Sequence, residues 1–269
     1  MDDHNPKGIK TNEAPTIYHP APAPYGIPYR CIYSKNIDNL FFAGRNISVT
    51  HSTMSSTRVM ATCAILGQAV GTAAQIAHKY GLNPRGVYNE RIHELQQELM
   101  KDDCYLPFVQ REINPIMKKC KIFADCEENP YLLINGEERN MKENGIVVAK
   151  GGSITLEFDR IQTIESLRIV LDSDINRLST GSPDYMPNRS TISGIPRNPQ
   201  CVHLPDCFAR DMTVQYRSQD GVWCNAKQII DNELRLLKIP VARETDGIKI
   251  IFDSAWGSDK INVFSVDIV

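Results

Sequence analysis

The chain has 269 residues, of which 42% are hydrophobic and 23% charged, and its formal net charge is −2 with a pI near 6.3. This length allows one large domain or two of ordinary size, and the composition is that of a soluble globular protein. Because Lys and Arg show neither an excess nor a polybasic run, the sequence excludes nucleic acid as a partner and gives no support for a polyanion or membrane surface.

Two segments near the N-terminus bear on targeting. Residues 1–6 are acidic and polar, which is not the pattern of a signal peptide. Residues 59–77 run for nineteen residues without a charge, but they are rich in Ala and Gly and sparse in the Leu, Ile, Phe and Val that favour membrane insertion. The sequence therefore predicts a buried helix in a soluble domain and no membrane partner, and it leaves the compartment open, including export of a longer protein.

The eight cysteines include no Cys-x-x-Cys pair. The nearest approach to a metal site is Cys201-x-His203-x-x-x-Cys207, with Cys224 further along the chain. Structural zinc sites use four ligands in closely spaced pairs, and that spacing is missing. We predict no metal site, and unpaired or partly buried thiols.

The first hundred residues are predicted to hold a strand and two helices. A Pro-rich extended segment of about thirty residues is followed by an apolar run at 37–44, which is typical of a buried strand ending in Gly44. Hydroxyl residues at 55–57 favour the start of a long helix that ends at Tyr80 and is closed by Gly81. A second helix is predicted over 84–101, with Pro84 in its first turn.

From about residue 120 the pattern changes to short alternating segments. Period-two alternation predicts strands, and Asn135-Gly136, Gly151-Gly152 and Asp220-Gly221 supply turn signals between them. A long polar loop covers 173–200. This spacing predicts an antiparallel β-sandwich with strands at 153–158, 167–171, 212–216, 248–252 and 261–266.

The residues that most suggest a ligand-binding site lie in the segment from Asn39 to Ala74. Gly44 lets the backbone approach a ligand closely, and the loop after it leads to a helix whose N-terminal N–H groups suit an anion. Gly67 and Gly71 lie one turn apart and suit close packing against a neighbour. A strand, a loop and a capped helix are also common in α/β domains that bind nothing.

The ordered motifs in this segment resemble one family. The segment contains Ala43-Gly44-Arg45, Thr50-His51, Ser56-Thr57-Arg58-Val59-Met60, and Gly67-Gln68-Ala69-Val70-Gly71-Thr72-Ala73-Ala74. With Tyr25-Gly26-Ile27-Pro28-Tyr29-Arg30 before them, they resemble the end of the flavin domain in a bacterial family of FAD-dependent oxidoreductases. Some members carry a xanthan lyase label, which is not itself evidence of lyase activity. The resemblance covers roughly residues 20–100 and implies FAD as the cofactor.

The resemblance also implies roles for individual residues. Gly44, Arg45 and Asn46 are expected beside the ribityl-pyrophosphate part of FAD. The helix facing the isoalloxazine is expected to start at Ser55, Ser56, Thr57 and Arg58. His51 is the candidate catalytic group, because His moves protons near neutral pH, or it hydrogen-bonds only within the loop. Arg58 is the second catalytic candidate, pairing with a substrate carboxylate or the flavin carbonyl, or it forms a structural ion pair.

One part of a flavin domain is missing from the sequence. Such a domain needs a strand, Gly-x-Gly-x-x-Gly and a helix for the pyrophosphate, yet the sixteen glycines contain no Gly-x-Gly. In the family that this segment resembles, the motif lies near the N-terminus of a much longer chain. The sequence therefore resembles a C-terminal fragment, and we expect the chain alone to bind FAD weakly or not at all.

The C-terminal part resembles galactose-binding-like, discoidin-type sandwiches, through its turn signals, its alternating strands and Asp220-Gly221-Val222-Trp223. Carbohydrate at the sandwich loops is therefore a candidate partner, with Trp256 and Tyr185 as stacking residues and Trp223 predicted to be core. The run from Asp172 to Asn176 suits calcium or a sugar hydroxyl, or consists of solvated loop charges.

Together these observations predict an α+β chain. Residues 1–102 are assigned to the C-terminal part of an FAD domain, 103–119 to a connector and 120–269 to a galactose-binding-like β-sandwich. Two functions stand: part of a flavoenzyme that transfers hydride to or from a small organic substrate of unknown identity, or a carbohydrate- or partner-binding module with an inert flavin remnant.

Overall fold

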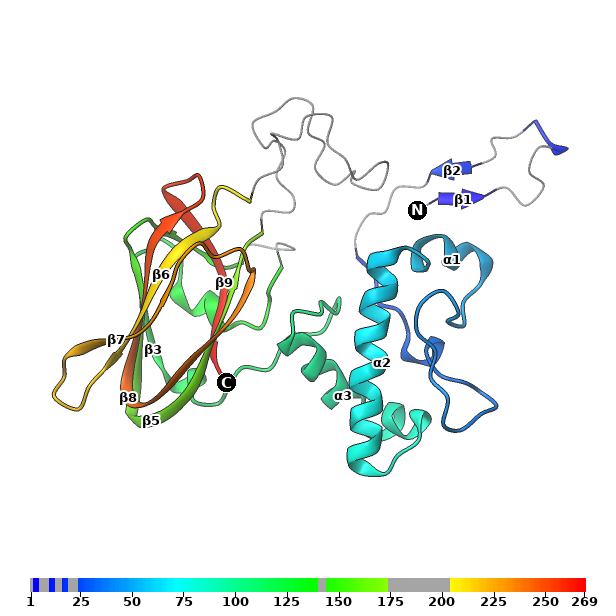
Figure 1. Ribbon diagram of the computed structural model, residues 1–269, viewed down its shortest axis with the longest axis horizontal. Helices are drawn as coiled ribbons and strands as arrows, with labels where there is room; N and C mark the ends of the chain where they lie inside the picture. The colour runs from blue at the N-terminus through cyan, green and yellow to red at the C-terminus, as the bar shows by residue number, and fades with distance from the viewer. Residues whose placement is uncertain (1, 5–9, 13–15, 19–23, 140–143, 174–203) are drawn as a thin grey trace. The chain divides into compact units, whose positions relative to one another are not determined.

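The computed structural model describes residues 2–4, 10–12, 16–18, 24–139, 144–173 and 204–269. The chain divides into two compact units, Met1–Arg111 and Glu112–Val269. The first is mainly helical and the second is built on an antiparallel sheet, which confirms the predicted α+β class (Figure 1).

The N-terminal unit contains three α-helices in its described part. A two-stranded antiparallel pair, β1 (Asp2–His4) and β2 (Thr16–Tyr18), comes first, followed by the 3₁₀ turn η2 (Tyr29–Cys31). The helices are α1 (His51–Thr57), α2 (Met60–Tyr80) and α3 (Pro84–Lys101).

The α2–α3 connection forms as the sequence predicts. Gly81 ends α2 in the left-handed region, with φ 64°, where a residue without a Cβ is favoured. Asn83 then caps α3, its side chain accepting a hydrogen bond of 2.7 Å from the Gly86 N–H, and Pro84 occupies the first turn. Both signals are local in sequence, which is why the bounds of α3 are predicted correctly.

A small apolar core holds these two helices together. It consists of buried side chains from facing sides of α2 and α3, with Cys104 beyond them: Ala73, Ile76, Ala77, Val87, Leu95 and Leu99. Tyr29 packs on this core, stacks on Tyr88 with ring centroids 6.0 Å apart, and donates a hydrogen bond to the Pro84 carbonyl. The preceding loop is thereby fixed to α3.

The strand predicted at 37–44 is wrong. The structure has only an isolated antiparallel bridge, between Tyr33 and Phe41, and Ile37 and Leu40 are 52% and 37% exposed. A buried strand needs hydrogen-bonding partners along its edges, and among the described residues the run 37–44 pairs only through this bridge and does not join the β1–β2 sheet.

The prediction that residues 59–77 are buried is also wrong for most of the helix. Only Leu66, Ala73, Ile76 and Ala77 of α2 are buried, whereas Met60 is 90% exposed. Among the described residues α2 is the one helix with the length and mean hydropathy, 1.3, to cross a bilayer, and the core helices of water-soluble proteins commonly pass that test too. Its Ala and Gly content gives little drive for insertion.

The C-terminal unit is a seven-stranded antiparallel sheet folded over one core. Its strands run in the order β4-β9-β5-β8-β6-β7, with β3 also paired to β5. The 3₁₀ turns η3 (Met117–Lys119) and η4 (Pro130–Ile134) flank β3. The strands are β3 (Lys121–Ala124), β4 (Ile146–Ala149), β5 (Ser153–Leu171), β6 (Ala209–Arg217), β7 (Trp223–Ile229), β8 (Leu236–Ala255) and β9 (Lys260–Ile268).

Two long strands bend and join both layers of this sheet. The first half of β5 pairs with β3 and with the second half of β8, and the second half of β5 pairs with β9 and with the first half of β8. The register shifts between Glu157 and Gln162, which marks a bulge where the strand changes direction. The sequence pattern thus predicts the antiparallel sandwich correctly but misses β3, β4 and the first half of β8.

Candidate functional site

The loop at Gly44 is anchored on both sides and exposed at its tip. Ile47 is 5% exposed and packs with Ile32 and Leu66, while the Phe42 N–H donates a hydrogen bond of 2.8 Å to the Ile32 carbonyl. Gly44 has φ +87°, and a Cβ added there would meet only the Asn46 Oδ1, at 3.9 Å. The backbone at Gly44 is therefore open to close approach by a ligand.

The helix α1 places His51 at its exposed first position. Thr50 is the N-cap, and its hydroxyl accepts a hydrogen bond from the Thr53 N–H at 3.4 Å. His51 is exposed, and no hydrogen bond within the described part of the chain involves its side chain. The imidazole is thus free to contact a substrate.

The hydroxyl groups of Ser55, Ser56 and Thr57 bond to the helix backbone. Ser55 Oγ lies 2.8 Å from the Ser52 carbonyl, and Ser56 Oγ and Thr57 Oγ1 each lie 3.1 Å from the Thr53 carbonyl. Ser56 Oγ also contacts the Tyr25 hydroxyl. Ser55 and Thr57 are buried. These groups stabilise the last turn of α1 and leave little capacity for a cofactor.

The long helix begins later than the sequence suggests. Arg58 ends α1, Val59 is extended with ψ 149°, and α2 starts at Met60 without any side-chain cap. The predicted helix start at Ser55, Ser56, Thr57 and Arg58 is therefore wrong. The hydroxyl groups of this turn contact preceding backbone carbonyls, and such hydrogen bonds bend a helix. Thr57 and Val59 are also β-branched, which lowers helix propensity. Both features favour a break at this point.

The first-turn N–H groups of α2 consequently have no capping side chain. Met60 at the first position is 90% exposed, so the described side chains do not cover this end of the helix. An uncapped helix N-terminus attracts negative charge, which suits the helix that is expected to face the isoalloxazine.

The two catalytic candidates lie at opposite ends of α1. His51 is the first residue of this helix and Arg58 follows its last residue. At a rise of ~1.5 Å per residue the two backbones are roughly 10 Å apart. The pair can flank a small substrate, but the two residues do not form a hydrogen-bonded dyad.

A comparison with protein-family models bears on this segment. Residues 1–99 match the family described as FAD dependent oxidoreductase. The matched range holds every predicted site residue, from Gly44 to Arg58. This match confirms the predicted resemblance, and the matched range is less than half of the chain. A comparison with curated proteins found no match.

The solved structures similar to this chain include carbohydrate-binding modules. The family 32 module of Streptococcus pneumoniae EndoD is 12% identical, with a TM-score of 0.39 over 57% of this chain and 97% of that one. The family 32 module of C. perfringens NanJ, solved with galactose, is 11% identical, with a TM-score of 0.39 over 58% and 97%. A chitosan-binding module from a Paenibacillus sp. IK-5 chitosanase/glucanase is 10% identical, with a TM-score of 0.39 over 58% and 98%.

The match to the flavin family raises the question of whether the residues present fit FAD. The open backbone at Gly44, the exposed Arg45 and Asn46, and the uncapped start of α2 suit one side of a flavin nucleotide. No glycine-rich turn between a strand and a helix exists in the sequence to hold the pyrophosphate. The chain therefore has residues that suit one side of FAD and lacks the turn that would hold the pyrophosphate.

Neither tryptophan of the sandwich lies where the sequence predicts. Trp223, predicted to be core, lies on the outer face of the sheet, with Arg217 and Lys249 over its ring at 5.5 and 4.8 Å. Trp256, predicted to stack on a sugar, packs against the core and donates its indole N–H to the Asn232 carbonyl at 2.8 Å. Arg210 covers its ring at 5.2 Å, which leaves little face for a ligand.

Several candidate residues fall outside the described part of the chain. These are Tyr185, the Cys201 and His203 of the cysteine–histidine cluster, and Asp174 and Asn176 of the loop after β5. Among the residues that the structure does describe, no group of three or more His, Cys, Asp or Glu is arranged to hold a metal ion.

Proposed function

We propose that this chain supplies the C-terminal, flavin-facing part of an FAD-dependent oxidoreductase, which transfers hydride to or from a small organic substrate. We further propose that the chain holds FAD only when a second polypeptide segment completes the domain. The family match supports the first statement, and the exposed face of α2 supports the second.

The observation that carries the proposal is the open, uncharged face of α2. Met60 and Ile65 on this face are 90% and 51% exposed, and a Cβ added at Gly67 or Gly71 would meet no atom within 4 Å. Its exposed residues are Met60, Ala61, Ala64, Ile65, Gly67, Gln68, Gly71, Ala74 and Gln75. A helix of this composition, with glycines one turn apart, is built to pack closely, and within the described unit nothing packs there.

The residues of the segment then take distinct roles. Gly44, Arg45 and Asn46 bind the ribityl-pyrophosphate part of FAD, through backbone approach and exposed polar groups. The N–H groups at the start of α2 would stabilise negative charge on a bound flavin. When bound, the flavin supplies the hydride chemistry. His51 moves a proton at the substrate, and Arg58 pairs with a substrate carboxylate.

Co-expression tests the proposal. The chain is co-expressed with a neighbouring coding region that carries strand, Gly-x-Gly-x-x-Gly and helix, and the purified complex is examined for flavin absorbance. We expect a yellow complex, a colourless chain alone, and bleaching of the flavin when a reducing substrate is added. A colourless complex of two folded, associated partners would contradict the proposal.

Variants separate the roles in that complex. His51→Ala and Arg58→Ala are expected to retain flavin but slow substrate-driven bleaching. We expect a loss of about 10²-fold or more for His51→Ala, which removes a proton-transfer group, and a slower reaction for Arg58→Ala, which removes the partner of the substrate carboxylate. His78→Ala on α2 and Arg30→Ala in η2 are matched exposed controls that should leave both readouts unchanged. Unaltered bleaching in His51→Ala would contradict the proposed proton transfer by His51.

A second function is a carbohydrate- or partner-binding sandwich with an inert flavin remnant. The observation that favours it is that Glu112–Val269 is a compact unit with its own continuous core, which is independent of the flavin segment. A glycan array on the chain tests it. Retention of sugars by a chain that stays colourless with every dinucleotide-binding partner would favour this second function.

A further inference from the structure

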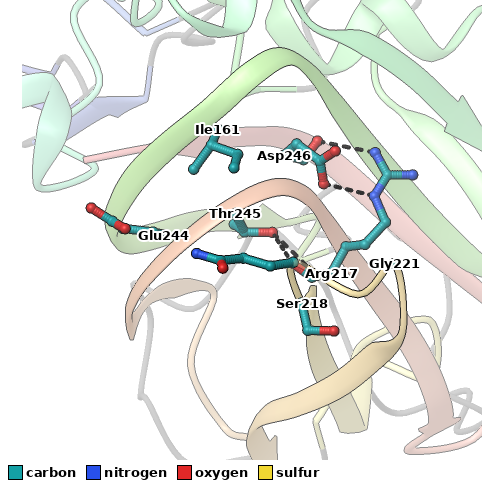
Figure 2. Close-up of a pocket in the computed structure, with 8 residues that line it drawn as sticks. Ile161, Arg217, Ser218, Gly221, Glu244, Thr245 and Asp246 are labelled. Carbon is teal, nitrogen blue, oxygen red and sulfur yellow. Dashed lines mark hydrogen bonds and ion pairs between the residues drawn. The ribbon is translucent and has the colours of Figure 1, made fainter.

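A pocket of about 400 Å³ lies at the bend of the sandwich, where β5 and β8 pass from one layer to the other. Its walls come from the bulge of β5, the turn between β6 and β7, and the bend of β8. The lining residues are Ile161, Arg217, Ser218, Gln219, Gly221, Glu244, Thr245 and Asp246 (Figure 2). This volume is near the lower end of the ~300–1,000 Å³ typical of small-molecule sites.

The floor of the pocket is fixed by Thr245. Its side chain is buried, and Oγ1 lies 2.8 Å from both the Arg217 and the Gly247 carbonyl oxygens. The same oxygen accepts hydrogen bonds from the Arg217 N–H at 3.2 Å and the Gly247 N–H at 3.1 Å. The β6 and β8 backbones are therefore held at one separation before any ligand arrives, which lowers the entropic cost of binding.

Arg217 is held in one orientation by three acceptors. Nε donates to Asp246 Oδ1 at 2.7 Å and Nη2 donates to the Asp246 carbonyl at 3.3 Å (Figure 2). Nη1 donates to Glu157 Oε1 at 3.1 Å. Gly247 makes room for this arrangement, because a Cβ there would lie 3.0 Å from Trp223 Cη2 and 3.3 Å from Arg217 Cζ. The hydrogen bond to Asp246 raises the pKa of Arg217, so its positive charge is permanent.

Charge excludes one class of ligand from this pocket. Asp246 and Glu157 together more than neutralise Arg217, and Glu244 adds a further carboxylate at the rim. Glu244 is exposed and makes no hydrogen bond or ion pair with the described residues. The charged side chains that line the pocket are one cation, Arg217, and two carboxylates, Glu244 and Asp246, so we expect the lining to favour a neutral or cationic ligand over an anion.

The remaining groups suit a hydroxyl-rich ring. Ser218 and Gln219 can each donate and accept hydrogen bonds, and Glu244 accepts them strongly from an ammonium or a hydroxyl group. Ile161 is 54% exposed and offers an apolar surface to the C–H face of a ring. Figure 2 shows Ile161 and Ser218 on opposite sides of the row formed by Glu244, Thr245 and Arg217.

We propose that this pocket binds an amino sugar, with its protonated amine on Glu244 and its hydroxyl groups on Ser218, Gln219 and Asp246. The site is distinct from the loop end of the sandwich, where sugar contact is predicted from the sequence. Trp256 directly follows the end of β8 and lies ten residues beyond Asp246, which is roughly 30 Å of extended chain. The proposal does not depend on the flavin function.

Titration of the full chain by two-dimensional amide NMR tests this site. The probes are glucosamine, glucose and glucuronate, which share a ring and differ in charge. We expect glucosamine to bind with a dissociation constant on the order of 1 mM for a small open pocket, glucose more weakly, and glucuronate not at all. The shifted amides should be those of residues 218–221 and 244–246.

Variants complete the test. Glu244→Gln should weaken glucosamine binding by about tenfold, the effect of removing a charged hydrogen-bond partner, and should change glucose binding much less. Glu233→Gln, which removes an exposed carboxylate from the same unit, is the matched control and should bind as the original chain does. The proposal is overturned if glucuronate binds as well as glucosamine, if Glu244→Gln binds normally, or if the shifts map to the residues around Trp256. Absence of saturation at about 50 mM glucosamine, far above the expected constant, also overturns it.

Discussion

Arg168 and Glu138 form a two-pronged ion pair inside the sandwich, with Nη1–Oε1 at 2.5 Å and Nη2–Oε2 at 2.9 Å. Arg168 is fully buried, and Ser265 Oγ donates a further hydrogen bond to Glu138 Oε1 at 2.7 Å. Arg235 also contacts the Glu138 carbonyl. This cluster fastens the segment after η4 to β5 and β9, and it places charge inside the sandwich without leaving that charge unpaired.

Breaking this pair should strongly destabilise the sandwich. Glu138→Gln removes the carboxylate charge from the two-pronged contact with the buried Arg168, and breaking a buried ion pair in this way typically costs about 3–5 kcal/mol in the free energy of unfolding. Both tryptophans lie in the C-terminal unit, so urea unfolding followed by tryptophan fluorescence measures that unit alone. Asp231→Asn, which removes an exposed partner of Arg210, should change stability by less than about 1 kcal/mol. Equal losses of stability in the two variants would show that the buried ion pair contributes no more to the free energy of unfolding than the exposed one.

Gly145→Ala should prevent normal pairing of β4 with β9. Gly145 has φ +76°, and an added Cβ would lie 2.6 Å from the Val263 carbonyl oxygen, a contact that forces the backbone to move. Gly151→Ala is the matched control, since Gly151 has φ +79° but open space around it. We expect about 1–2 kcal/mol of destabilisation for Gly151→Ala, from the left-handed backbone alone, and a clearly larger loss for Gly145→Ala. The same fluorescence assay measures both, and similar losses would contradict the predicted clash.

Cys120 should make the stability of the sandwich depend on alkaline pH. Burial raises the pKa of the Cys120 thiol from its ordinary value near 9 to about 12. Between these pH values the unfolded chain releases the thiol proton and the folded chain keeps it, so stability is lost as pH rises through that range. Cys120→Ala should show a smaller fall in urea midpoint between pH 8 and pH 10, values that bracket the ordinary thiol pKa. An equal fall in both proteins would assign the pH effect to other groups.

Gly67→Ala should have opposite effects on the isolated chain and on the completed flavin domain. In the chain alone the added methyl group meets no atom within 4 Å, so greater helix propensity should stabilise α2 by about 0.5–1 kcal/mol. In the complex the same methyl group lies in the proposed packing face and should weaken association. Thermal unfolding of the helical signal and pull-down of the partner measure the two effects. Asn89→Ala, on the exposed side of α3, is the control for association.

Local signals in the sequence predict the structure well where neighbouring residues alone decide it. Gly81, Asn83 and Pro84 fix the turn and the start of α3 through contacts within a few residues. The alternation at 153–158 likewise predicts the first part of β5, because its inward positions, Ile154, Leu156 and Phe158, are buried.

The predictions from sequence are wrong where contacts between residues far apart in the chain determine the structure. The run at 37–44 has the composition of a buried strand, but a strand also requires a sheet to join, and among the described residues this run joins none. The inward side of the edge strand β7 is set by its pairing with β6, so alternation alone could not show that Trp223 faces outward over Gly247. The pocket at Glu244 and Arg217 forms only through the register of β5, β6 and β8, and its residues carry no motif.

The most direct test of the account is equilibrium titration of FAD with the purified chain, followed by quenching of flavin fluorescence. The open α2 face and the missing pyrophosphate turn predict no saturable quenching by the chain alone, and saturable quenching once the completing polypeptide is present. Stoichiometric, tight binding of FAD by the chain alone would contradict the central claim.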